Sequence, residues 1–575
     1  MKELWRYLQK YKKECVLAPL FKMLEASFEL MIPLVMRTII DQGIGGSDAP
    51  LIVRMVLLMV ALGLVGLLAA VTAQYFSAKA ATGFAVSVRH ALFEHMEALS
   101  FSNMDRMGTS TMITRMTSDV NQAQTGVNMT LRLFLRSPFV VFGAMVMAFT
   151  IDTRSALIFV AVIAALSLVV FGLMAMNIPM MRGVQRALED VLGATRENLT
   201  GARVIRAFRR EDAQYEEFLK RNEALVNRQK RAGRVSGLMN PVTYLMINFA
   251  IAWLIHTGAL QVQTGILTAG QVVALYNYMS QILVELIKLA NLIVTMNKAF
   301  ASWKRIEDVL RLQPDMREDG SVHVPAIHAD EAVRFENVSL HYPTAGEESL
   351  QDISFTALRG QMIGVIGGTG SGKSSLARLI PRFYDASHGA VLVDGMDVRE
   401  WSQAELRHKV GYVPQKAVLF HGTIRDNLKW GNPDATDEDL MNAVRAAQAE
   451  DVVNAKGGLN AMLEQGGRNL SGGQRQRLTI ARALARRPEI LVLDDSASAL
   501  DQATDKRLRK AIRALDYHPT TFVISQRAAS IRRADQIVVL EDGKMAGLGT
   551  HAQLMEQCEV YREIYESQYG GEASA

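Results

Sequence analysis

The sequence predicts an α-helical membrane domain followed by an α/β P-loop domain that binds a nucleotide. Three observations carry this prediction. The chain has 575 residues, 49% hydrophobic and 21% charged, so it is too long for one domain and too apolar for an ordinary soluble protein. Long apolar stretches fill the first 300 residues. A glycine-rich phosphate-binding motif stands among alternating strand-like and helical segments in the second half.

The membrane domain is predicted from six apolar stretches, each long enough to cross a hydrocarbon core of ~30 Å. They cover residues 15–40, 53–77, 133–151, 155–178, 238–261 and 271–297. The connections 78–132 and 179–237 keep helical patterning, so we expect membrane helices to continue out of the bilayer. The expected parts are an amphipathic interfacial helix at 1–14, a transmembrane domain at 15–300, a polar linker at 301–331 and the nucleotide-binding domain at 332–575.

Basic residues predict the orientation of these helices. The loop at 41–50 contains acids but no Lys or Arg, whereas thirteen Lys and Arg residues fall within 182–234. Cytoplasmic loops of membrane proteins carry an excess of Lys and Arg. We therefore expect a multi-pass protein of the plasma or inner membrane, with both termini and the nucleotide-binding domain in the cytoplasm.

Charge and cysteine content exclude two other classes of function. The net charge is only +5, with acidic and basic residues interspersed, so the chain lacks the basic tail or patch of a nucleic-acid-binding protein, and no nucleic-acid partner is expected. Cys15 and Cys558 are the only cysteines, so neither a disulfide framework nor a cysteine-based metal site is expected.

Charged residues inside the predicted spans are candidate functional groups, because charge is costly in a bilayer. Lys22, Glu25 and Glu29 share one helical face in the first span, and Glu285 and Lys288 share another in the last. Two interpretations stay open. Glu25, Glu29 and Glu285 could face a central cavity and attract cationic amphiphiles, or they could pair with neighbouring lysines and fix the helix register.

A phosphate-binding loop is predicted at residues 367–375 (GGTGSGKSS). Its glycines let backbone N–H groups approach the phosphates, while Lys373 reaches the β and γ oxygens and the Ser374 hydroxyl ligates Mg²⁺. Asp494 follows the strand-like run 490–493 and looks like a Walker B carboxylate, a resemblance that implies that it holds the same Mg²⁺ through water. ATP and Mg²⁺ are therefore the expected ligands. The expected loop residues are Gly367, Gly368, Thr369, Gly370, Ser371, Gly372, Lys373, Ser374 and Ser375.

A second glycine-rich segment, LSGGQ at residues 470–474, leads into a segment of good helix formers at 475–485. A helix N-terminus of this kind favours an anion. A P-loop followed by LSGGQ resembles the ATP-binding cassette (ABC) family, and six spans fused ahead of one cassette resemble an ABC exporter half-transporter. The resemblance implies that the nucleotide also meets Ser471, Gly472, Gly473 and Gln474.

The resemblance assigns further roles by position. Tyr342 would stack on adenine, and Gln415 would ligate Mg²⁺ or position water. Residues 498–501 would form the D-loop along the dimer seam. Segments 101–106, 114–122 and 197–208 resemble the intracellular loops of exporters, whose short coupling helices dock on the ATPase domains; the alternative is that they are solvated helical faces.

Two candidate catalytic positions depart from the family pattern. Asp495 stands where the family has a catalytic glutamate, and Gln526 replaces the switch histidine. Aspartate is one methylene shorter, and a misplacement of ~1 Å can cost on the order of 10²-fold in rate. Glutamine can donate a hydrogen bond but cannot carry a proton near neutral pH. We expect ATP binding to survive and hydrolysis to be impaired; the alternative is that both changes are tolerated in a working site.

These departures predict a partner. In ABC dimers each ATP lies between the P-loop of one subunit and the signature of the other, and this chain carries one of each. It resembles the degenerate-site subunit of heterodimeric bacterial multidrug exporters. The expected partner is a second half-transporter with an intact Walker B glutamate, an intact switch histidine and an altered signature.

The expected substrate is a small amphipathic molecule or drug. Three alternatives stay open: a lipid, peptide or siderophore transporter, a homodimeric exporter with two active sites, and a regulatory subunit that binds ATP without driving transport.

Overall fold

The computed structural model describes residues 6–316, 330–342 and 346–569. It divides into two compact units. The membrane unit contains Met1–Glu97 and Ser110–Arg311, and the nucleotide-binding unit contains Ala98–Thr109 and Leu312–Ala575. Residues 1–5 of the expected interfacial helix and 317–329 of the expected linker lie outside the described residues.

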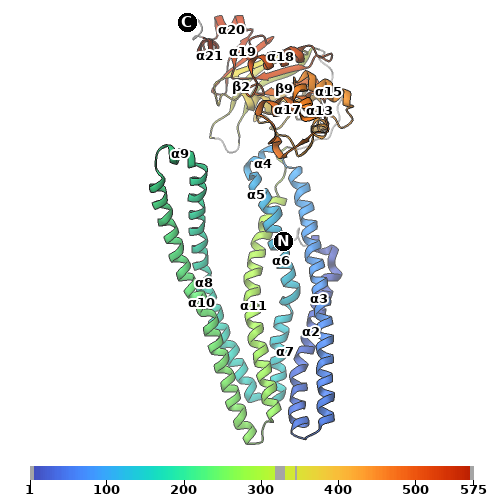
Figure 1. The fold of residues 1–575 in the computed structure, drawn as a ribbon, viewed down its shortest axis with the longest axis vertical. Helices are drawn as coiled ribbons and strands as arrows, with labels where there is room; N and C mark the ends of the chain where they lie inside the picture. Colours follow the sequence, from blue (N-terminus) through green and yellow to red (C-terminus); the bar gives the residue numbers. More distant parts are fainter. Residues whose placement is uncertain (1–5, 317–329, 343–345, 570–575) are drawn as a thin grey trace. The chain divides into compact units, whose positions relative to one another are not determined.

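Long helices build the membrane unit. They are α2 Lys12–Thr38, α3 Ala49–Glu97, α5 Thr109–Thr114, α6 Val120–Met129, α7 Arg136–Ile151, α8 Thr153–Thr200, α9 Ala202–Ala207, α10 Glu211–Gln263 and α11 Ala269–Leu310. A 3₁₀ turn at Gln9–Tyr11 precedes α2, and π-helical turns at Ile39–Ile44, Arg115–Asp119 and Thr130–Phe134 interrupt the series. Figure 1 shows α8 and α10 running side by side up to α9, as predicted for a helix pair that continues beyond the bilayer.

Five helical stretches in the described residues are long and apolar enough to cross a membrane: Ala49–Glu97, Thr109–Ile151, Thr153–Thr200, Glu211–Gln263 and Ala269–Leu310. The remaining predicted span, at 15–40, lies in α2. This helix is long enough to cross a membrane, but it carries the charged residues Lys22, Glu25 and Glu29. Helices α8 and α11 begin at side-chain caps. The Asp152 carboxylate accepts from the Ser155 N–H ahead of α8, and Thr268 forms a capping box with Gln271 ahead of α11.

Three sheets form the strand content of the nucleotide-binding unit. A six-stranded sheet has the order β12-β11-β3-β10-β9-β6 and is parallel except for β12, and a four-stranded antiparallel sheet has the order β2-β1-β4-β5. Strands β7 and β8 form a separate antiparallel pair. The strands are β1 Glu331–Leu340, β2 Leu350–Leu358, β3 Met362–Gly367, β4 His388–Val393, β5 Met396–Asp397, β6 Val410–Val413, β7 Gly422–Thr423, β8 Met462–Leu463, β9 Ile490–Asp494, β10 Thr520–Ile524, β11 Gln536–Glu541 and β12 Lys544–Gly549.

Short helices complete this unit. They are α4 Phe101–Met107, α12 Lys373–Leu379, α13 Gln403–Lys409, α14 Ile424–Lys429, α15 Asp437–Ala446, α16 Glu450–Lys456, α17 Gly472–Leu484, α18 Gln502–Arg513, α19 Ala528–Ile531, α20 His551–Gln557 and α21 Glu559–Tyr569, with a 3₁₀ turn at Gln465–Gly467. Strands β3, β6, β9 and β10 are parallel, so their carboxyl ends meet at one edge of the sheet. Ligands of open α/β sheets bind at this edge.

The predicted fold class is confirmed, and the predicted domain boundaries stay predictions. Three features of the structure lie across those boundaries. Helix α2 already begins at Lys12, inside the segment expected as an interfacial helix. Helix α11 runs to Leu310, ten residues past the expected end of the membrane domain at 300, because the buried side chains of Ile306 and Val309 keep its helical face packed. The segment Ala98–Thr109, expected in the transmembrane domain, groups with the nucleotide-binding unit.

Candidate functional site

The phosphate-binding loop leaves the carboxyl end of β3 and enters α12. A Cβ at Gly367 would lie 2.1 Å from the carbonyl oxygen of Leu540 in the neighbouring strand β11, so only glycine fits there. Gly370 and Gly372 have φ of +86° and +93°, a region that side chains other than glycine rarely adopt. The shape of the loop that would cradle phosphates therefore requires glycine at these three positions.

Lys373 lies under this loop and is buried. Its Nζ donates to the carbonyl oxygens of Gly367 and Gly368 at 2.9 and 2.5 Å. Burial lowers the pKa of the ammonium group, and the nearby carboxylates of Asp495 and Asp494 oppose that shift. The cation is thus held beside the loop, where phosphate oxygens are better acceptors than neutral carbonyls.

Asp494 ends β9 and is 1% exposed. Its two oxygens accept from different hydroxyls: Oδ1 from Ser374 Oγ at 2.8 Å and Oδ2 from Tyr412 Oη at 2.7 Å. Burial and Asp494 together raise the pKa of Tyr412, so the phenol stays protonated and keeps donating. No motif recognised in the sequence assigns a role to Tyr412, although it stands three residues before Gln415.

The residues present fit a Mg²⁺ ion. The Ser374 hydroxyl and the Asp494 carboxylate are adjacent hard oxygen donors, and Mg²⁺ commonly uses one or two such protein groups with phosphates and water. The described residues contain no cluster of three or more His, Cys, Asp and Glu that could hold a metal by themselves. When bound, Mg²⁺ would neutralise charge on the β and γ phosphates.

Asp495 follows directly and is half-buried with φ of +45°. Its Oδ2 accepts from Gln415 Nε2 at 3.1 Å, and its N–H donates to the carbonyl oxygen of Ile524 at the end of β10. Burial raises the pKa of its carboxyl group, the charge of Asp494 adds to the rise, and the Gln415 hydrogen bond opposes it. The side chain is therefore a stronger base than an ordinary aspartate.

Gln526 lies just past β10, so β3, β9 and β10 bring the loop, Asp495 and Gln526 to one edge of the sheet. Its side chain is exposed. The backbone carbonyl oxygen of Gln526 accepts a hydrogen bond from Gln568 Nε2 at 2.8 Å. The side-chain oxygen Oε1 of Gln568 accepts one from the Ala528 N–H. Helix α21 thus holds the backbone of the segment that carries Gln526.

Tyr342, expected to stack on adenine, is half-buried beside the same loop. Its Oη donates to Ser375 Oγ at 3.2 Å, and its ring meets Tyr384 edge to face at 5.0 Å. These contacts place the ring next to the P-loop helix, and the adenine contact remains a prediction.

The signature segment forms the start of α17. Ser471 caps this helix: its Oγ accepts from the Gln474 N–H, and Gln474 Oε1 accepts from the Ser471 N–H. A Cβ at Gly473 would lie 2.9 Å from the carbonyl oxygen of Ala499 in the D-loop segment, whereas nothing lies within 4 Å of one at Gly472. Within the described part of the chain, no hydrogen bond or ion pair joins residues 367–375 to 471–474.

The three membrane carboxylates converge on one cation that the sequence analysis missed. Arg136, at the start of α7, binds Glu285 at 2.5 Å and Glu29 at 2.6 Å, and lies 4.0 Å from Glu25. Lys288 binds Glu285, and Lys22 binds Glu25. Internal pairing therefore holds, with an arginine as the main partner. Arg136 lay inside a predicted span, and that charge was the signal available.

Two of these carboxylates also line a pocket of about 330 Å³ in the membrane unit. Glu29 is the more accessible, with 38% of its side chain exposed, against 3% for Glu285. The other lining residues are four apolar side chains, two amides, a hydroxyl and a lysine: Ile32, Pro33, Met36, Val284, Asn277, Gln281, Ser280 and Lys288.

One expected coupling segment forms a capped helix against the ATPase fold. Ser100 caps α4, Phe101 lies 4.6 Å from Phe383 between ring centroids, and Asp105 accepts from Tyr384 Oη at 2.5 Å. Both partners follow α12, the helix that the P-loop opens. The docking expected for 101–106 is confirmed. The segment 197–208 contains the short helix α9, and 114–122 contains a π-helical turn.

A helical membrane domain joined to a P-loop domain with a signature helix defines a membrane transporter driven by ATP. A family model for the ABC transporter transmembrane region matches residues 15–286, and one for the ABC transporter cassette matches 350–498. The chain belongs to the ABC transporter family, as an exporter-type half-transporter.

Several relatives match over nearly the whole chain. The uncharacterized ABC transporter ATP-binding protein YfiB of Bacillus subtilis is 34% identical over 100% of both chains. An ATP-dependent lipid A-core flippase of Yersinia pestis is 29% identical over 99% of this chain and 98% of its own. The structure of a bacterial Atm1-family ABC exporter with ATP bound shares the fold, with a TM-score of 0.79, 23% identity and coverage of 97% and 98%.

Proposed function

We propose that this chain is one subunit of a heterodimeric exporter that moves amphipathic small molecules out of the cytoplasm. In this proposal it binds ATP at a degenerate site and lends its signature to the catalytic site of a partner half-transporter. The observation that carries the proposal is the pair of departures at Asp495 and Gln526, which both lie at the sheet edge beside the P-loop.

The contacts of Asp495 support slow hydrolysis. A general base must come within ~2.6 to 3.2 Å of the water it activates, and this carboxylate is one methylene shorter than glutamate. One of its oxygens is also engaged by Gln415. The raised pKa makes the Asp495 carboxylate a better proton acceptor, but the side chain is still one methylene shorter than that of glutamate. Gln526 can donate to a γ-phosphate oxygen but cannot exchange a proton.

The signature supports the second half of the proposal. The helix α17 presents Ser471, Gly472 and the N-terminal amides on an exposed surface, as an anion site requires. In the proposed heterodimer this surface meets the γ-phosphate bound by the partner, whose Walker B glutamate and switch histidine carry out hydrolysis. We also propose that the nucleotide-binding domain lies in the cytoplasm.

The experiment is ATP hydrolysis by purified assemblies. This chain alone and this chain with a co-purified half-transporter are compared at equal cassette concentration, using a partner that has both catalytic residues. We expect the mixed assembly to turn over at least about tenfold faster, on the scale that a displaced base costs. Brisk turnover by this chain alone would contradict the heterodimer and favour the homodimeric alternative.

A lipid-like substrate is the second candidate, and a specific observation favours it. Glu29 and Glu285 are neutralised by Arg136 and Lys288, so the pocket does not present an unpaired carboxylate to a cationic drug. The Yersinia pestis relative is a lipid A-core flippase. Substrate stimulation of ATP hydrolysis in vesicles, with cationic drugs and with phospholipids or glycolipids as separate arms, distinguishes the two.

A further inference from the structure

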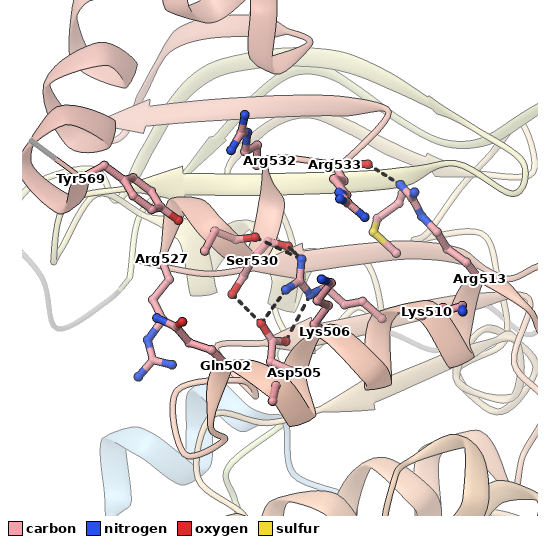
Figure 2. A pocket seen from close by; sticks show the side chains of 14 residues that line it. Gln502, Asp505, Lys506, Lys510, Arg513, Arg527, Ser530, Arg532, Arg533 and Tyr569 are labelled. Carbon is pink, nitrogen blue, oxygen red and sulfur yellow. Dashed lines mark hydrogen bonds and ion pairs between the residues drawn. The ribbon is translucent and has the colours of Figure 1, made fainter. Parts of the chain in front are cut away.

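A strongly basic pocket of about 710 Å³ lies in the nucleotide-binding unit, between α18 and the segment that runs from β10 through α19. Seven of its lining side chains are Lys or Arg, and only one is an acid. None of its residues belongs to the P-loop or the signature. Figure 2 shows Lys506, Lys510 and Arg513 along one helix, with Arg532 and Arg533 across from them.

The single acid, Asp505, is already engaged. It is 5% exposed, and its Oδ2 accepts from Arg509 Nη2 at 2.8 Å and from Ser530 Oγ at 3.0 Å, which the dashed lines in Figure 2 trace. Arg509 also donates to the carbonyl oxygens of Ala529 and Ser530. This network joins α18 to α19 and builds the pocket wall. Asp505 and Arg509 neutralise each other, so the acid that lines the pocket does not offset the charges of the other lining cations.

Three of those cations are free to bind a ligand. Lys506, Lys510 and Arg533 are exposed, and their side chains make no hydrogen bond or ion pair with other described residues. Lys506 and Lys510 stand four residues apart on α18, a spacing at which like charges repel. The nearest carboxylate to Arg513 is that of Asp535, at 3.9 Å. A multiply charged anion would relieve this repulsion.

Size and donor chemistry narrow the class of anion. The volume lies within the range of ~300 to 1,000 Å³ typical of small-molecule sites. One Arg guanidinium can donate two parallel hydrogen bonds to the oxygens of a phosphate, and each Lys adds a positive point charge. We propose that this pocket binds a small molecule with several phosphate groups, whether a free oligophosphate or the phosphate chain of a nucleotide.

The pocket reaches the ATP-hydrolysing machinery through Arg527. This residue lines the pocket and follows Gln526, and it donates to the carbonyl oxygens of Ser498 and Leu500 in the D-loop segment at 3.3 Å each. A phosphate bound by Arg527 competes with these neutral acceptors. The pocket therefore adjoins the D-loop segment and the backbone that carries Gln526.

Calorimetric titration with inorganic tripolyphosphate tests the proposal. The full chain carries Lys373→Ala and Ser374→Ala in every sample, so that the P-loop does not compete. We expect one saturable site per chain, weakened by about tenfold or more in Lys506→Ala/Lys510→Ala. The matched control is Lys416→Ala/Lys544→Ala, which removes two exposed lysines elsewhere in the unit, with an expected change below about threefold. Unfolding temperatures measured for all variants show whether each variant is still folded.

A second arm replaces tripolyphosphate with ATP. Equal affinity identifies the phosphate chain as the ligand, and tighter binding of ATP identifies a nucleotide; both outcomes support the proposal. It is overturned if binding does not saturate, or if the pocket and control variants lose the same affinity, since a diffuse basic surface would behave in that way.

Discussion

Gln415 Nε2 donates to Asp495 Oδ2 at 3.1 Å, which links the loop after β6 to the residue after β9. The contact occupies one oxygen of Asp495, the candidate base, and it joins that base to Gln415, which the family resemblance assigns to Mg²⁺ ligation or to positioning water. Movement of Gln415 would therefore reposition Asp495 directly. The first predictions concern Asp495, which Gln415 holds, and Gln526, which lies just past the neighbouring strand β10.

Restoring the family residues should raise hydrolysis. Asp495→Glu combined with Gln526→His lengthens the base by one methylene and adds a group that can exchange a proton, so we expect turnover of the assembly formed by this chain alone to rise on the order of 10²-fold. Steady-state phosphate release measures it. The control, Asp495→Ala, should change turnover of the heteromeric assembly little. Loss of most activity in that control would show that Asp495 is a working base.

Ser471→Arg should nearly abolish turnover of the heteromeric assembly, because a bulky cation would replace the hydroxyl and amides that meet the partner's nucleotide. Thr436→Arg is the matched control: Thr436 also caps a helix, α15, through a capping box and is exposed. Each change costs about 1 kcal/mol of helix capping. Equal loss of activity in both variants would assign the effect to folding.

Asp495→Asn should change the stability of the fold by an amount that depends on pH. The pKa of Asp495 is raised above its ordinary value of 3.8. Its contribution to stability is therefore complete below about pH 3.8 and is lost as the pH rises through the raised pKa. Asparagine keeps the shape and the acceptor for Gln415 but does not ionise.

The variant should thus become more stable relative to the wild type as the pH rises from acidic toward neutral. Unfolding temperatures of both proteins across that range measure the difference. A constant difference, or one that falls with rising pH, would contradict the raised pKa.

Arg136→Gln should destabilise the membrane unit, because it leaves Glu285 buried without its main counter-ion. Breaking such a pair typically costs about 3 to 5 kcal/mol. Thermal unfolding in detergent or nanodiscs measures the loss. Arg154→Gln is the control, since Arg154 is exposed at the start of α8. Adding Glu285→Gln to Arg136→Gln should recover part of the stability; no recovery would mean that the pair is not the source.

Phe101→Ala should weaken coupling between substrate and hydrolysis. The change removes the ring contact with Phe383, worth about 0.5 to 1.5 kcal/mol beyond area burial. We expect substrate stimulation of ATP hydrolysis to fall while basal turnover persists. Met104→Ala is the control on the same helix, with comparable exposure. Equal effects of both variants would contradict a specific role for the Phe101 contact.

Much of the nucleotide site could be predicted from the sequence, because its parts are contiguous motifs. The spacing of residues 367–375 requires a tight glycine loop after a strand, and the positive φ of Gly370 and Gly372 agrees with it. Tyr412 could not be assigned in this way. Its bond to Asp494 joins residues 82 positions apart, and only the parallel pairing of β6 with β9 brings them together.

The membrane charges show the same division. The helical spacing of Lys22, Glu25 and Glu29 was evident along the chain, yet the partner that decides their role lies on α7, at a sequence separation of 107 residues from Glu29. Local periodicity determines which face a residue occupies, but not which helix packs on that face.

The sequence by itself determined the two-part fold, the ATP motifs and the two unusual positions, Asp495 and Gln526, because each depends on local pattern or residue identity. Only the tertiary structure decided that Arg136 neutralises the membrane carboxylates, that Gln415 holds Asp495 and that seven basic side chains gather around one pocket. The physical reason is that charge interactions act through space over a few ångströms, and chain folding brings residues from distant segments within that distance.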